Sequence, residues 1–253
     1  MKLGAKTALG IDISESRINL VLLSGGAKGA ELVKSAGAPV PDGAIKAGSI
    51  ADAGLLAHAL RELKVRNKIG WTNHAAISLL CRPVVLQLID LPRPLPTNVG
   101  RFAQNEAKRC VALSGKRISF DYCRAGSARD GGGRLLIVAT DEGQVARLSD
   151  TCSRAGLNVE AIEPALIACA RALHTGRMTG ESDCNLLLAT LRDDVLSLCV
   201  FRGLALDFVR TRSITEENPA QGAFCDWLAQ QINAVIKFYD FEVVEAGRNW
   251  EIV

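Results

Sequence analysis

Hydrophobic and polar residues alternate at the start of the chain in the way that is typical of short antiparallel strands. Thr7–Asp12 and Ile18–Leu23 are two such runs, and Ser14–Arg17 between them has the polar composition of a tight turn. A second turn at Ser24–Gly29 leads into a third run at Ala30–Ala36. The pattern therefore predicts a three-stranded meander.

The middle of the chain alternates between helical and strand periodicity. Within Asp52–Arg66 the apolar residues recur at helical spacing and predict one amphipathic helix. Three prolines within Asp90–Pro96 break the pattern, since proline fixes φ and lacks an amide donor. The remaining runs predict strands at 75–80, 84–89, 118–123, 134–140 and 157–162, and helices at 97–111, 141–155 and 164–174.

The opening pattern returns near the end of the sequence. Runs at 185–191, 195–201 and 204–212 predict a second meander, and a long helix at 221–240 and a strand at 250–253 follow it. Two meanders, each followed by a helix and a strand, predict a duplicated α/β unit. This architecture resembles the actin-like (ribonuclease H-like) fold, which is the fold class that we expect. We expect residues 1–96 to form a first half, 97–160 an inserted small α/β subdomain, and 161–253 the return to the first half and a partial second half.

Composition excludes several classes of protein. The 253 residues are 48% hydrophobic and 23% charged, which are ordinary values for a globular chain. The formal charge is only +3 and the basic residues are scattered, so we do not expect a nucleic-acid partner. No apolar run approaches the roughly 20 residues of a membrane-spanning helix, and no signal peptide is recognisable. These features favour a cytoplasmic protein.

Cysteine and histidine spacing argues against a metal site. No Cys-x-x-Cys pair occurs among the eight cysteines, and the three histidines stand alone, so we expect no zinc and no catalytic nucleophile paired with histidine. We expect the cysteines to be reduced, several of them as small buried side chains. The eight are Cys81, Cys110, Cys123, Cys152, Cys169, Cys184, Cys199 and Cys225.

Several stretches resemble the type IV pilus assembly protein PilM family and occur in that family's order. The first is the strand–turn–strand opening Leu9–Ile18. The others are Val40–Ile50, Asp90–Pro92 with Arg101–Ala107, Leu136–Thr140, Ala155–Leu157, and Ile162–Ala165 with Ala170–Leu173. The resemblance covers roughly residues 8–213 and identifies the chain as a shortened or divergent member of an actin-like ATPase superfamily.

The first turn departs from ATP-binding relatives, in which it reads Asp-x-Gly and holds a phosphate and a metal-bound water. Asp12 matches this pattern, but Ser14 replaces the glycine and Glu15 adds a negative charge. The resemblance therefore makes Asp12, Ser14, Ser16 and Arg17 a vestigial phosphate turn. An alternative interpretation of Asp12 is a carboxylate that caps the turn.

The second phosphate turn departs further, because Thr190 and Arg192 stand where the family has aspartate and glycine. Arg192 with Asp193 and Asp194 could form a remade phosphate site, but a solvated hairpin tip is favoured. Lys108, Arg109, Lys116 and Arg117 could form a modest basic surface or a merely solvated one. We expect no cofactor, with ATP and magnesium as the alternative.

The resemblance implies a scaffold rather than an enzyme. PilM-like proteins lie at the inner face of the inner membrane and bind the cytoplasmic tail of a bitopic partner, PilN, in a groove between the first sheet and the inserted subdomain. We expect this chain to do the same, peripheral to the membrane only through that partner, as a pseudo-ATPase without catalytic residues. Alternatives are an actin-like ATPase or small-molecule kinase with a divergent site, and the cytoplasmic domain of a GspL-like type II secretion protein.

Overall fold

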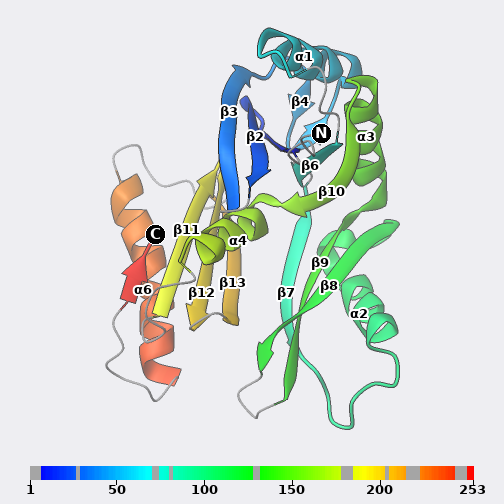
Figure 1. Ribbon diagram of the computed structural model, residues 1–253. Coiled ribbons are helices and arrows are strands. Elements are labelled where there is room, and N and C mark those ends of the chain that lie inside the picture. The colour runs from blue at the N-terminus through cyan, green and yellow to red at the C-terminus, as the bar shows by residue number, and fades with distance from the viewer. Residues whose placement is uncertain are drawn as a thin grey trace. The chain divides into compact units, whose positions relative to one another are not determined.

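The computed structural model describes residues 7–26, 29–69, 74–79, 82–127, 132–177, 185–202, 205–214, 223–242 and 250–253 (Figure 1). The chain divides into two compact units. The first takes Met1–Val85, Glu106–Phe120 and Ala139–Cys169, and the second takes Leu86–Asn105, Asp121–Val138 and Ala170–Val253. Groups of strands are separated by helices along the chain.

The first unit is built on a five-stranded sheet with the order β10-β6-β1-β2-β3. β1, β2 and β3 form the predicted antiparallel meander, and β6 and β10 extend it with parallel pairing. Alternate β1 residues Leu9, Ile11 and Ile13 are buried, which is the period of two that the sequence shows. The five strands are β1 (Thr7–Ile13), β2 (Arg17–Gly26), β3 (Gly29–Pro39), β6 (His74–Leu79) and β10 (Asn158–Pro164).

Two helices bury their apolar faces in the core of this unit. α1 (Ala53–Arg66) begins at Asp52, whose carboxylate accepts from two backbone amides of the first turn, and α3 (Glu142–Arg154) begins at Asp141. The core also takes residues from the short hairpin β4 (Ile45–Lys46) and β5 (Ser49–Ile50).

Polar contacts tie the two helices of this unit together. At the C-terminal end of α3, Lys64 Nζ donates to the Gly156 carbonyl at 3.3 Å and the Arg61 guanidinium donates to the Arg154 carbonyl. Two cations of α1 therefore lie at the negative end of the α3 dipole.

The second meander forms a four-stranded sheet in the second unit, with the order β13-β12-β11-β14. Its strands are β11 (Asn185–Arg192), β12 (Val195–Arg202), β13 (Ala205–Ser213) and β14 (Trp250–Ile252). The helix α6 (Phe224–Glu242) contributes Val235 and Tyr239 to a hydrophobic cluster with this sheet. α4 (Ala165–Arg177) precedes the second meander in the chain. The repeated meander confirms the duplication.

A separate three-stranded sheet has the order β7-β9-β8, and most of it belongs to the second unit. Its strands are β7 (Val84–Asp90), β8 (Ile118–Ser127) and β9 (Gly133–Asp141), and α2 (Val99–Lys108) with a 3₁₀ turn at Val111–Leu113 lies between β7 and β8 in the chain. β8 and β9 do not join the sheet of β1.

The strands that share a hydrogen-bonded sheet do not all lie within one predicted domain. β7 precedes residue 97 but is hydrogen-bonded to β9, which lies within the predicted inserted part, residues 97–160. The strand expected at 157–162 inside that part is β10, and this expectation is corrected because β10 pairs with β6 in the first sheet. The division into 1–96, 97–160 and 161–253 stays a prediction about folding units.

No helix within the described ranges is long and apolar enough to cross a membrane.

The core of the first unit predicts a strong contrast between two leucines of α1. Leu60 is 1% exposed and Leu55 is 42% exposed. Leu60→Ala leaves a cavity and should lower the free energy of unfolding by about 2–5 kcal/mol, whereas Leu55→Ala should change it by about 0.5 kcal/mol. Urea unfolding followed by circular dichroism measures both, and equal effects would contradict this packing.

Candidate functional site

The turn between β1 and β2 is closed by its own serine. Ser14 is buried, and its hydroxyl accepts hydrogen bonds from the backbone amides of Arg17 at 3.0 Å and Ser16 at 3.3 Å. The Ser14 amide donates to the Arg17 carbonyl at 2.8 Å. Phosphate sites of this kind use free backbone N–H groups. Here the hydroxyl already occupies two of them.

The structure brings all four predicted site residues to one end of the β1–β2 hairpin. Asp12 pairs with Asn19 across the hairpin, and its carboxylate accepts a hydrogen bond from the Ser78 hydroxyl of β6. The Arg17 Nε donates to the Asn19 side chain at 3.4 Å. Sequence reasoning missed Ser78, because only the parallel pairing of β1 with β6 places it there.

A carboxylate also lies on this turn. Glu15 is 3.8 Å from the Arg82 guanidinium, and Arg82 in turn packs against Gly48 of the β4–β5 hairpin. Gly48 has a φ of +69°, and a Cβ there would come within 2.6 Å of Arg82, so glycine is required. The negative charge beside the turn is thus held in place by a neighbouring cation.

The turn between β11 and β12 closes its own meander. Asp193 has a φ of +52°. The main-chain carbonyl of Asp194 accepts a hydrogen bond from the Ile214 amide at 2.7 Å, and its carboxylate accepts one from the Ser213 hydroxyl at 3.3 Å. Arg192 and Asp194 are half-buried because the end of β13 folds against this turn, whereas Asp193 is exposed. The solvated hairpin tip stays a prediction. The first turn belongs to one compact unit and the second turn to the other.

The predicted basic surface near α2 is largely neutralised. Arg109 pairs with Glu106 at 3.0 Å, Lys116 with Asp141 at 3.1 Å, and Arg117 with Glu142 at 2.9 Å. The hydrogen bond from Lys116 and the Gly143 amide lower the pKa of Asp141. Three of the four cations are therefore matched by carboxylates, which favours the solvated interpretation.

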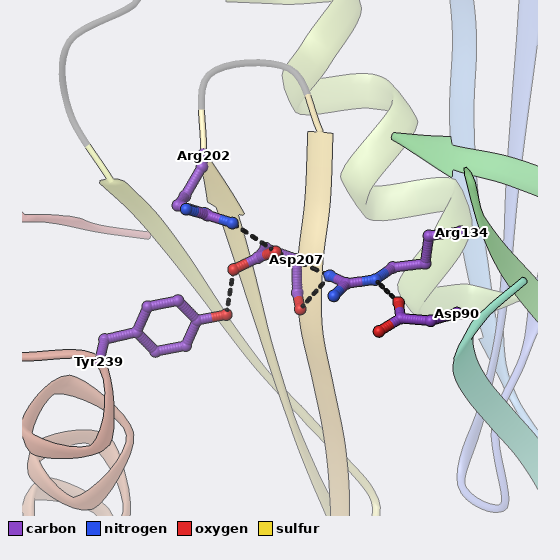
Figure 2. A network of polar contacts seen from close by, with 5 residues as sticks. All are labelled: Asp90, Arg134, Arg202, Asp207 and Tyr239. Carbon is purple, nitrogen blue, oxygen red and sulfur yellow. Dashed lines mark hydrogen bonds and ion pairs between the residues drawn. The ribbon is translucent and has the colours of Figure 1, made fainter. Parts of the chain in front are cut away.

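A polar network that sequence reasoning missed lies within the second unit (Figure 2). Arg134 of β9 donates from Nε to Asp90 at 2.6 Å and from Nη1 to Asp207 at 2.8 Å. Arg202 donates to the same oxygen of Asp207 at 2.9 Å, and the Tyr239 hydroxyl of α6 donates to the other at 2.8 Å. The only signal in the sequence is a charged residue at positions 134 and 207 within otherwise strand-like runs.

Asp207 carries its charge although its side chain is only 6% exposed. Burial by itself would raise the pKa of this carboxyl, but hydrogen bonds from Arg202 and Tyr239 and the nearby positive charges outweigh it and lower the pKa. The pKa of Arg134 is raised despite burial because Asp90 and Asp207 flank it. The Asp207 carboxylate and the Arg134 guanidinium are therefore charged at neutral pH.

A family model described as type IV pilus assembly protein PilM matches residues 10–206 of the chain. The chain belongs to the PilM family. The matched residues include the first turn, the three-stranded sheet and most of the second meander, which is the range over which the sequence motifs occur.

Solved structures agree with this PilM-family fold. The structure called "PilM-PilN type IV pilus biogenesis complex" matches with a TM-score of 0.78 and 19% identity over 97% of this chain and 88% of that one. The predicted actin-like fold class is thereby confirmed.

Two weaker structural matches complete the comparison. The cytoplasmic domain of EpsL, an inner membrane component of the type II secretion system of Vibrio cholerae, matches at a TM-score of 0.47 and 13% identity over 83% and 72% of the chains. The ethanolamine utilization protein EutJ from Carboxydothermus hydrogenoformans matches at 0.46 and 14% over 83% and 53%. No curated protein matches the chain in sequence.

The cysteines of this PilM-family chain differ in their surroundings. Cys152 and Cys199 are fully buried, and burial raises the pKa of each thiol to about 12. Cys169 and Cys225 are exposed, whereas Cys81 and Cys184 lie outside the described residues. No group of three or more metal-ligating side chains gathers within the described ranges.

Alkylation by iodoacetamide at pH 8 should separate these thiols. With a pKa of about 12, Cys152 and Cys199 remain almost fully protonated at that pH, and the thiolate is the reactive form. We expect each to react at least about 100-fold more slowly than Cys225 in the native protein and equally fast in urea. Mass spectrometry of digests measures this, and rapid native labelling of Cys152 would contradict the burial.

Proposed function

We propose that this chain is an adaptor of a type IV pilus assembly platform and binds the short cytoplasmic tail of a bitopic PilN-like protein at the inner face of the inner membrane. The family match over residues 10–206 carries the proposal. The member of the family in the similar solved structure is in a complex with PilN.

Edge strands in both units support a peptide-binding role. β3 lies at an edge of the five-stranded sheet, and β8 lies at an edge of the three-stranded sheet with Asp121–Arg124 exposed. Such edges offer main-chain donors and acceptors to an extended peptide, and alternate side chains beside them give specificity. An adaptor that recognises a tail by strand addition needs no catalytic group.

We further propose that the nucleotide site is degenerate. A phosphate at the first turn would have to displace the Ser14 hydroxyl from two backbone amides, each such hydrogen bond being worth about 0.5–1.5 kcal/mol. It would also have to approach the Glu15 carboxylate. Asp12, the residue that would orient a metal-bound water, is engaged by Ser78. These residues do not fit ATP with magnesium, so no step of phosphoryl transfer is derived for this chain.

Binding of the tail is testable with the chain and one peptide. A fluorescein-labelled peptide with the N-terminal cytoplasmic sequence of a PilN-like protein should raise the anisotropy with a Kd in the range of about 1–100 µM. A scrambled peptide of the same composition is the control. No binding up to millimolar concentration would refute the adaptor function.

The location of the tail can be mapped in the same complex. A benzophenone on the peptide should form adducts with β3 or β8 rather than with α6, which serves as the internal control. Adducts confined to α6 would show that the tail binds but not at the proposed edges.

Nucleotide turnover is tested separately. We expect isothermal titration with ATP and magnesium to give no affinity tighter than ~100 µM, which corresponds to about 5.5 kcal/mol. We also expect no phosphate release above background. Steady hydrolysis that Asp12→Ala abolishes would revive the ATPase alternative.

A further inference from the structure

The two sheets of the second unit do not share the core described for the four-stranded sheet. The hydrophobic cluster of that sheet takes residues from β11, β12, β13, α6 and Trp250, and among the described residues none comes from β7, β8 or β9. We call the boundary between these two sheets the seam. Across the seam, Arg134 donates hydrogen bonds to Asp207, and Gly126 closely approaches Ala205. The charged contact at this boundary is that of Arg134 with Asp207.

Asp207 lies at a β-bulge, and its side chain contacts Arg134 across the seam. In the pairing of β12 with β13, Val200 lies opposite Phe208 and Phe201 lies opposite Leu206, so Asp207 is the extra residue. A bulge leaves one residue out of the ladder and redirects its side chain. The Asp207 carbonyl also accepts from Arg134 at 3.3 Å, so both its side chain and its main chain meet the same guanidinium (Figure 2).

The charges of the network balance on each side of the seam. Arg134 and Asp90 lie on strands of the three-stranded sheet, and Arg202 and Asp207 lie on strands of the four-stranded sheet. If the Arg134–Asp207 contact opens, each side keeps one arginine–aspartate pair. Opening therefore leaves no isolated charge. An isolated buried charge is what makes the breaking of a buried ion pair costly.

Neighbouring contacts keep both sides ordered after opening. Tyr239 still holds Asp207 to α6, and the Leu91 amide still donates to the Gly133 carbonyl at 2.8 Å between the end of β7 and the start of β9. The Asp90 side chain is 58% exposed, so its carboxylate stays in contact with water while it holds the Arg134 guanidinium.

We propose that the Arg134–Asp207 contact is a latch that holds the three-stranded sheet against β13 and releases it as one body. This proposal does not rest on the proposed partner or on the state of the nucleotide site.

Two arginines bonded to the same oxygen of Asp207 provide a matched test. In hydrogen–deuterium exchange of the full chain, Arg134→Gln should speed exchange of the amides at 205–208 by about ten-fold or more. Amides within β7, β9, β11 and β12 should stay protected, since both sheets remain intact. Arg202→Gln should change exchange at 205–208 less than about three-fold, because Arg134 still bridges Asp207 to the other sheet.

Three results would overturn the latch. Equal effects of the two variants would make the network a uniform cluster, faster exchange throughout β11 and β12 would make it a core stabiliser, and no effect of Arg134→Gln would make the contact dispensable. If Arg134→Gln does not fold, Arg134→Lys decides the matter. Lysine keeps the charge but cannot donate to Asp90 and Asp207 as the planar guanidinium does, so this variant should speed exchange at 205–208 selectively. Absence of this selective effect would refute the proposal.

Discussion

Burial of one face of each meander is the constraint on which the rest of the structure depends. Alternate residues of β1 and β2 point into the core of the first unit, and α1 and α3 supply the apolar surface that covers them. In the second unit α6 covers the corresponding face of β11 and β12. A sheet that left these residues in water would lose its main stabilisation, so each helix has to pack where the meander presents its apolar face.

Polar groups at the turns of the two meanders form hydrogen bonds within those same meanders. Ser14 satisfies the amides of the first turn, and Asp194 accepts from the end of β13 in the second. Both groups thus close hairpins. The proposed degeneracy of the nucleotide site rests on the same Ser14 hydrogen bonds that stabilise the first turn.

The second unit combines an apolar core with an ionic seam, and the two respond differently to separation. Separating α6 from its sheet would expose Val235, Tyr239 and their neighbours to water. Separating Arg134 from Asp207 would return charged groups to water with a partner still beside each. The bulge at Asp207 shows that the strand departs from regular pairing at the point where the seam is made.

Local patterns in the sequence determined the elements, the turn residues and the duplication, because alternation, helical spacing and proline act over a few residues. The resemblance of ordered motifs likewise pointed to the family. Only the tertiary structure decided which sheet each strand joins: the runs of β7 and β10 would look the same beside any neighbour. The tertiary structure also decided the Arg134–Asp207 contact. The two residues are 73 positions apart in the chain, so no local sequence pattern predicts that the fold brings them together.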